Sequence, residues 1–92
     1  MQILYLSNRP HVMRETWQHV RHFMPWIDRA VIVAPDDRLR EFDLGPEVTV
    51  VGDTEVTGTS ATTLARLDHV RRNVTLRRAV VGTDLVEDRF LL

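Results

Sequence analysis

The stretches MQILYLSNRP at residues 1–10 and AVIVAPDD at residues 30–37 decide the fold of this chain. In each, an apolar run ends, at Leu6 and at Ala34, where polar residues begin. Apolar runs without alternation are typical of strands that are covered on both faces. We therefore predict two neighbouring parallel strands that point the same way. Ligands of open α/β sheets bind beyond the carboxyl ends of the strands, so these polar loops are where a site would begin.

A helix is predicted between the two strands, over residues 11–24. Met13, Trp17 and Val20 recur at helical spacing and form one apolar stripe. Pro25 ends the helix, because it disfavours helical geometry at the residue before it and cannot continue the hydrogen-bond ladder. After the second strand we predict a short helix over residues 37–42, with Asp36 as its cap.

The second half of the chain repeats the alternation of strand and helix. We predict a third strand over residues 48–51, a loop over 52–60 and a long helix over 61–81 that Gly82 ends. A turn over 84–88 and a fourth strand over 89–92 follow. The long helix is capped by Thr59 or Ser60, and its apolar stripe consists of Leu64, Leu67, Val70, Val74 and Val81.

This order predicts an α/β fold, with a small open parallel sheet of three or four strands and flanking helices, in a Rossmann-like arrangement. The chain has 92 residues, of which 43% are hydrophobic, so we expect a single domain. It has no cysteine, which excludes a disulfide framework and thiolate chemistry and suits a reducing, cytoplasmic setting. We find no signal peptide and no apolar run that approaches the ~20 residues of a membrane span.

The charge of the chain gives little support to nucleic-acid binding. The net charge is −1, and aromatic residues are not interleaved with the basic ones. All 12 basic residues are arginine. Either codon usage or recognition of phosphate and carboxylate groups accounts for this, since guanidinium forks suit such groups. His19 and His22 lie one helical turn apart, but no third ligand occurs at compatible spacing, so we predict no metal site.

Two polar segments are candidates for a binding site. Ser7, Asn8 and Arg9 leave the first strand and open the first helix, where they can bind an anion or a base edge. Their alternative role is an ordinary helix start before Pro10. Asp36 and Asp37 follow the second strand, where an acid can accept a hydrogen bond from a ribose hydroxyl. Their alternative role is helix capping, and one residue could do both.

These segments also resemble a known family. The stretch from Leu4 to Asp37, with its two polar loops, looks like the opening of a GT-A-fold glycosyltransferase. Arg72-Asn73 followed by Phe90-Leu91-Leu92 is similar to the Arg-Asn helix and buried strand that lead into the acidic Asp-Xaa-Asp motif of that family. Met24-Pro25-Trp26-Ile27 is loosely similar to the sugar-phosphate transferases of capsule synthesis. Two departures are the lack of Gly-Ser after Asp36-Asp37 and the end of the chain before any Asp-Xaa-Asp.

The resemblance implies a protein that binds a nucleotide-diphosphate sugar for transfer to an acceptor. It implies nucleotide contacts from Ser7, Asn8, Arg9, Asp36, Asp37, Arg72 and Asn73, and Mg²⁺ or Mn²⁺ in the complete enzyme. We expect residues 1–92 to be the nucleotide-binding portion of a longer domain, without catalytic residues and inactive alone. The alternatives are a nucleotide-binding domain of another doubly wound family and a non-catalytic interaction or regulatory domain. An interaction or regulatory domain would pair through an open sheet edge, either with a partner or with a second copy as a homo-oligomer.

Overall fold

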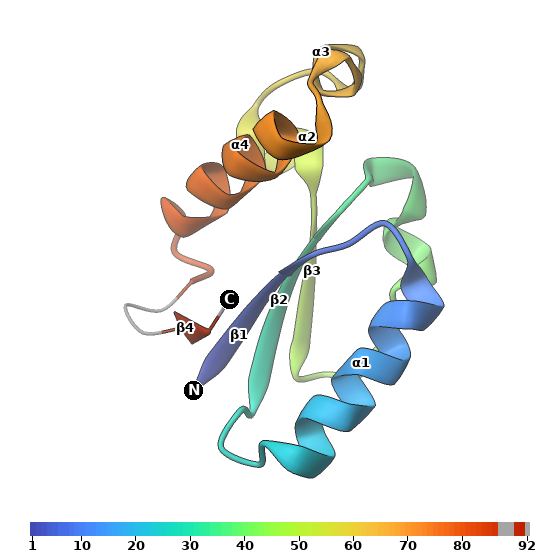
Figure 1. Cartoon of the computed structure of the whole chain (residues 1–92), viewed down its shortest axis with the longest axis vertical. Coiled ribbons are helices and arrows are strands. Elements are labelled where there is room, and N and C mark those ends of the chain that lie inside the picture. The colour runs from blue at the N-terminus through green and yellow to red at the C-terminus, as the bar shows by residue number, and fades with distance from the viewer. Residues whose placement is uncertain (87–89, 92) are drawn as a thin grey trace.

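Four parallel strands form the centre of the fold (Figure 1). The computed structural model describes residues 1–86, 90 and 91, the last two without side chains. The sheet has the order β3-β2-β1-β4. Its strands are β1 (Gln2–Leu6), β2 (Arg29–Ala34), β3 (Val48–Gly52) and β4 (Phe90–Leu91). The α/β prediction with a small open parallel sheet is confirmed, while the predicted turn at 87–88 and the strand positions Arg89 and Leu92 lie outside the described residues.

Helices cover both faces of the sheet. The helix α1 (Pro10–Phe23) and the 3-10 helix η1 (Asp36–Glu41) lie on one face. On the other face lie α2 (Asp53–Thr57) and α4 (His69–Val81), and α3 (Ala61–Arg66) packs beside α2, beyond the carboxyl edge of the sheet (Figure 1). In Figure 1 the carboxyl ends of β1, β2 and β3 point to the top of the picture, between α4 and η1. No helix within the described residues is long and apolar enough to cross a membrane.

Alternate side chains of the two central strands enter two separate core layers. On β1, Ile3 packs on the α1 side with Trp17, and the next residue, Leu4, packs on the α4 side with Val80. On β2, Ile32 packs on the α1 side and its neighbours Val31 and Val33 on the α4 side, as the two-residue period of a strand requires. Ile32 and Val80 are both 0% exposed. This double burial explains why β1 and β2 consist of unbroken apolar runs.

The first helix and the first three strands end within a residue of their predicted positions. Two shorter features differ. Asp36 is the first residue of η1 and Pro35 is its N-cap, so the predicted cap by Asp36 is wrong. The predicted loop over residues 52–60 contains the short helix α2, which ends at Gly58 in the left-handed conformation, with φ +67°. Glycine adopts that conformation without the steric cost that other residues pay.

The predicted long helix over residues 61–81 is wrong as a single helix. Ser60 caps α3 as expected, but α3 ends at Arg66 and α4 begins at His69. Asp68 caps this second start, since its carboxylate Oδ1 accepts a hydrogen bond from the backbone N–H of Arg71 at 2.8 Å. Leu64 of the predicted apolar stripe is buried, but the part of the stripe on α4 faces outward. Val70 and Val81 are 69% and 42% exposed, and α4 instead buries Leu76 and Val80.

Removing the cap at Asp68 tests the cause of this break. We expect Asp68→Ala to lower the free energy of unfolding by about 1 kcal/mol, because the N–H of Arg71 loses its acceptor and α4 loses a favourable charge at its start. Urea denaturation measures the change. Asp84→Ala, in the exposed turn after α4, is the control and should leave the unfolding midpoint unchanged. Equal effects of the two substitutions would contradict the capping role.

Candidate functional site

A cavity opens at the carboxyl edge of the sheet, under the first turns of α4. It has a volume of about 250 Å³. We call it the edge cavity. It is formed by the ends of three strands and one face of α4, and is lined by Leu6, Ser7, Asn8, Val33, Ala34, Pro35, Asp53, His69, Arg72, Asn73 and Leu76. Four of the seven predicted contact residues therefore meet here, from segments more than sixty positions apart in the sequence: Ser7, Asn8, Arg72 and Asn73.

The polar loop after β1 is held to its neighbours at both ends. The backbone N–H of Ser7 donates to the Val33 carbonyl at 3.0 Å, which continues the β1–β2 ladder by one residue. The Ser7 hydroxyl accepts from the N–H of Arg9 at 3.2 Å. On the far side, the Arg38 guanidinium Nη1 donates to the Asn8 carbonyl at 3.2 Å. This loop is thus positioned by the sheet and by η1 before any ligand binds.

Arg72 lines the edge cavity and carries one side-chain donor without a partner. Its Nη2 donates to the Leu67 carbonyl at 3.4 Å, a long hydrogen bond. Its Nε is buried and is the single buried side-chain nitrogen or oxygen among the described residues that has no hydrogen-bond partner. Most buried polar groups are paired, because an unpaired one loses its hydration without compensation. His69, one turn before Arg72, and Asn73, directly after it, line the same wall, with His69 Nε2 and Asn73 Nδ2 3.2 Å apart.

Asp53 brings a carboxylate to the edge cavity. It is the first residue of α2, directly after β3, and its Oδ1 accepts from the N–H of Thr54 at 2.8 Å. Partial burial raises the pKa of the Asp53 carboxyl above its ordinary value; the N–H of Thr54 opposes this shift, and the Asp36 carboxylate adds to it. The cavity therefore combines one guanidinium, amide and hydroxyl donors, and one acid whose charged form is disfavoured.

The remaining predicted contact residues lie outside the cavity lining. Asp36 does not face it; its carboxylate bonds the Thr54 hydroxyl and lies against the backbone of Gly52. Arg9 is the exposed N-cap of α1, and Asp37 is exposed on η1. Asn8 thus lines the edge cavity and Asp36 does not, although β1 and β2 run side by side in parallel as predicted.

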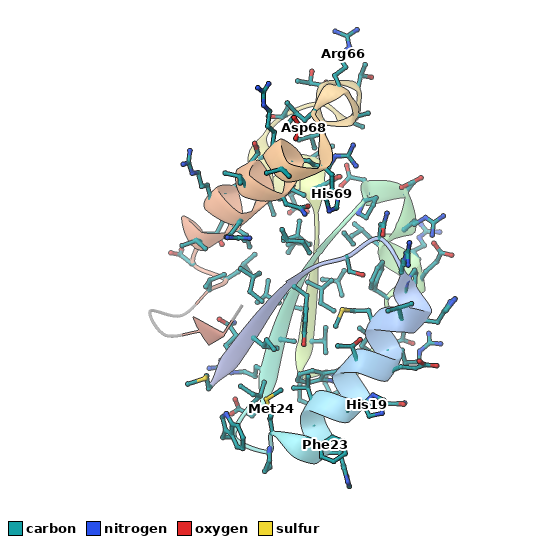
Figure 2. All side chains as sticks on the ribbon, viewed as in Figure 1. His19, Phe23, Met24, Arg66, Asp68 and His69 are labelled. Atoms are coloured by element: carbon teal, nitrogen blue, oxygen red, sulfur yellow. The ribbon has the colours of Figure 1, made fainter. Side chains whose placement is uncertain are left out.

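Two lining residues, Asp53 and His69, were missed by the sequence reasoning. The signal for Asp53 was available, because it follows a strand just as Ser7 and Asp36 do, and all three strands end at the same edge. His69 lies one helical turn before Asn73 and so shares its helix face. Figure 2 shows His69 at the start of α4, near this edge, whereas His19 and Phe23 lie at the opposite end of the molecule.

The residues present do not form a metal site of the expected kind. No group of three or more His, Cys, Asp or Glu side chains that could hold a metal ion occurs within the described part of the chain. His22 instead packs edge-on against the Phe23 ring, with centroids 4.6 Å apart. The Mg²⁺ or Mn²⁺ that the glycosyltransferase resemblance implies stays a prediction for the complete enzyme.

Comparisons with known proteins give no relative for this chain. No protein-family model matches it, and neither a curated protein nor a solved structure matches it. Its function must be argued from its own residues.

The close approach of Asp36 to Gly52 can be tested by a double-mutant cycle. A Cβ at residue 52 would collide with the Asp36 carboxylate, and it would lie 3.5 Å from Leu39 Cδ1. We expect Gly52→Ala to destabilise the protein by about 1 kcal/mol, because the exposed Asp36 side chain has to turn away and loses its hydrogen bond to Thr54. In an Asp36→Ala background the same change should be neutral or stabilising by ~0.4–1 kcal/mol, because φ −78° and ψ 143° suit alanine. Equal costs in both backgrounds, measured by urea unfolding, would refute this contact.

The raised pKa of Asp53 predicts a pH-dependent cost to stability. An acid whose folded-state pKa is raised disfavours folding once it ionises, so stability is lost as pH rises through that pKa. Asp53→Asn removes the ionisation and keeps an oxygen acceptor for the N–H of Thr54. The free energy of unfolding of the variant, relative to the natural chain, should therefore increase from about pH 3 to about pH 7. A difference that stays constant over this range, or that Asp84→Asn reproduces, would contradict the assignment.

Proposed function

We propose that this chain binds a nucleoside diphosphate sugar in the edge cavity and serves the donor side of a glycosyl transfer. The observation that carries the proposal is the convergence of Ser7 and Asn8 with Arg72 and Asn73 at the carboxyl edge of a parallel sheet. This is where open α/β sheets bind ligands. The guanidinium of Arg72, whose Nε has no hydrogen-bond partner, is the cationic group of this lining.

The composition of the cavity suits a ligand with both phosphate and hydroxyl groups. Arg72 and the donors around it match phosphate oxygens, which guanidinium groups bind through two parallel hydrogen bonds. Asp53 lines the same cavity and would accept a hydrogen bond from a ribose hydroxyl, the role that the sequence assigned to Asp36. The apolar walls come from the β1 and β2 ends, at Leu6 and Val33. The volume of about 250 Å³ is below the usual range of small-molecule sites, so the cavity would hold part of the ligand.

A second candidate function is a non-catalytic interaction domain. The specific observation in its favour is the outward stripe of α4, where Val70, Val74 and Val81 are 69%, 37% and 42% exposed. Exposed apolar stripes of this kind are typical of protein contacts. A dimer that persists at low concentration and shows no response to nucleotides would favour this function over the first.

Nucleotide titration tests the first proposal directly. UDP and GDP should cause saturable changes in the backbone amide NMR signals of Ser7, Asn8 and Asn73. Trp17 is buried on the α1 side of the sheet, away from the edge cavity, so Trp fluorescence is the weaker measurement. Arg72→Ala should reduce nucleotide affinity by about tenfold or more, the equivalent of one charge-assisted hydrogen bond.

Two further variants make this test specific. Arg72→Lys keeps the charge but loses the planar fork, so it should recover part of the affinity at most. Arg78→Ala removes an exposed arginine from the last turns of the same helix and should leave affinity unchanged. An equal loss in Arg78→Ala, or nucleotide-induced changes confined to residues outside the edge cavity, would refute the site.

A further inference from the structure

A second hollow lies on the α1 side of the same sheet edge. It has a volume of about 440 Å³ and is formed by the first turns of α1 together with η1 and the chain that follows it. We call it the arginine groove. Its charged lining comes from both elements: His11 and Arg14 from α1, Arg38, Arg40 and Glu41 from η1, and Asp43 after η1. Neither the predicted site nor the edge cavity uses these side chains, so their role is unassigned.

The guanidinium groups of this groove are not committed to ion pairs. Arg14, Arg38 and Arg40 form no salt bridge with any carboxylate within the described part of the chain, even though Glu41 and Asp43 line the same hollow. The Arg38 guanidinium makes one hydrogen bond, to the Asn8 carbonyl, which leaves its other N–H groups available. Three cations gathered from two elements repel one another, and an anion between them would relieve this repulsion.

The arginine groove is lined by both positive and negative side chains, and this combination limits the kinds of ligand that it can bind. Guanidinium forks bind phosphate oxygens through paired hydrogen bonds, while carboxylates accept hydrogen bonds from hydroxyl groups. Two carboxylates would repel a polyanion such as nucleic acid. We propose that the arginine groove binds a phosphorylated sugar, with the phosphate on Arg14, Arg38 and Arg40 and the sugar hydroxyls on Glu41 and Asp43.

The position of the groove gives this ligand a role. Arg38 of the arginine groove bonds the carbonyl of Asn8, whose residue lines the edge cavity, so the two hollows meet at the loop over residues 7–9. Two ligands bound in the two hollows would lie on opposite sides of one short loop. The groove would then hold the acceptor of the glycosyl transfer; this role rests on the proposed function, whereas the binding of a phosphorylated sugar does not.

NMR titration with three probes tests the binding itself. Glucose 6-phosphate should shift the amide signals of His11, Arg14, Arg38 and Arg40 saturably, and more tightly than inorganic phosphate; glucose should shift them least. The double variant Arg14→Gln/Arg40→Gln should weaken glucose 6-phosphate binding at least tenfold. Arg77→Gln/Arg78→Gln removes the same charge from α4 and should leave binding unchanged. Glu41→Ala/Asp43→Ala should bring the affinities for glucose 6-phosphate and inorganic phosphate closer together.

Each contrary result overturns the inference. No saturable shift, an equal loss in Arg77→Gln/Arg78→Gln, or shifts at Arg72 and Asn73 in place of the groove would exclude this site. Equal affinity of the natural chain for glucose 6-phosphate and inorganic phosphate would exclude the sugar contacts. UDP titrated into Arg14→Gln/Arg40→Gln reports on the edge cavity separately, so failure of the groove and failure of the nucleotide site give different outcomes.

Discussion

The parallel pairing of β1 with β2 is the constraint on which the rest of the structure depends. Five residue pairs, from Gln2 opposite Arg29 to Leu6 opposite Val33, fix the register of the two strands. A shift by one residue would turn every side chain of β1 to the other face. Ile3 would then leave the α1 layer and Leu4 the α4 layer, and both core layers would lose their centre. The same register brings Ser7 beside Val33 and so determines where the edge cavity opens.

The strands could be predicted because their burial determines which amino acids they contain. A strand covered on both faces needs no polar side chain, so residues 3–6 and 30–34 are continuous apolar runs that no surface helix would contain. The first helix could be predicted for a related reason. Met13, Trp17 and Val20 are spaced to face one layer, and Pro25 prevents its continuation. These features depend on local sequence alone.

The second half shows where local sequence is insufficient. Leu67, Val70 and Val74 have helical spacing, and a single helix would bury them. The carboxylate of Asp68 competes with that pattern, since it can cap a new helix, and tertiary packing of Leu76 and Val80 against the sheet decides which arrangement forms. Periodicity identifies a possible stripe, but it does not state which face of the helix meets the core.

The exchange of roles between Asp36 and Asp53 has a similar origin. Both acids follow strands at the same edge, and sequence gives no reason to prefer one. The absence of a side chain at Gly52 lets the Asp36 carboxylate lie against the backbone and bond Thr54, which removes it from the cavity. Asp53 is then the acid that faces the cavity. Which of the two acids lines the cavity depends on the contact between Asp36 and Gly52. These residues are separated in the sequence by an entire strand, so the contact can be recognised only in the folded structure.

The loop after β1 connects the two hollows physically. Its side chains at Ser7 and Asn8 line the edge cavity, while its carbonyl at Asn8 is held by Arg38 of the arginine groove. A phosphate on the N–H groups of Arg38 that remain available would leave this hydrogen bond in place. The guanidinium would then bind the ligand on one side and hold the Asn8 carbonyl on the other. The position of the loop in the edge cavity and the binding of an anion in the groove would therefore depend on the same side chain.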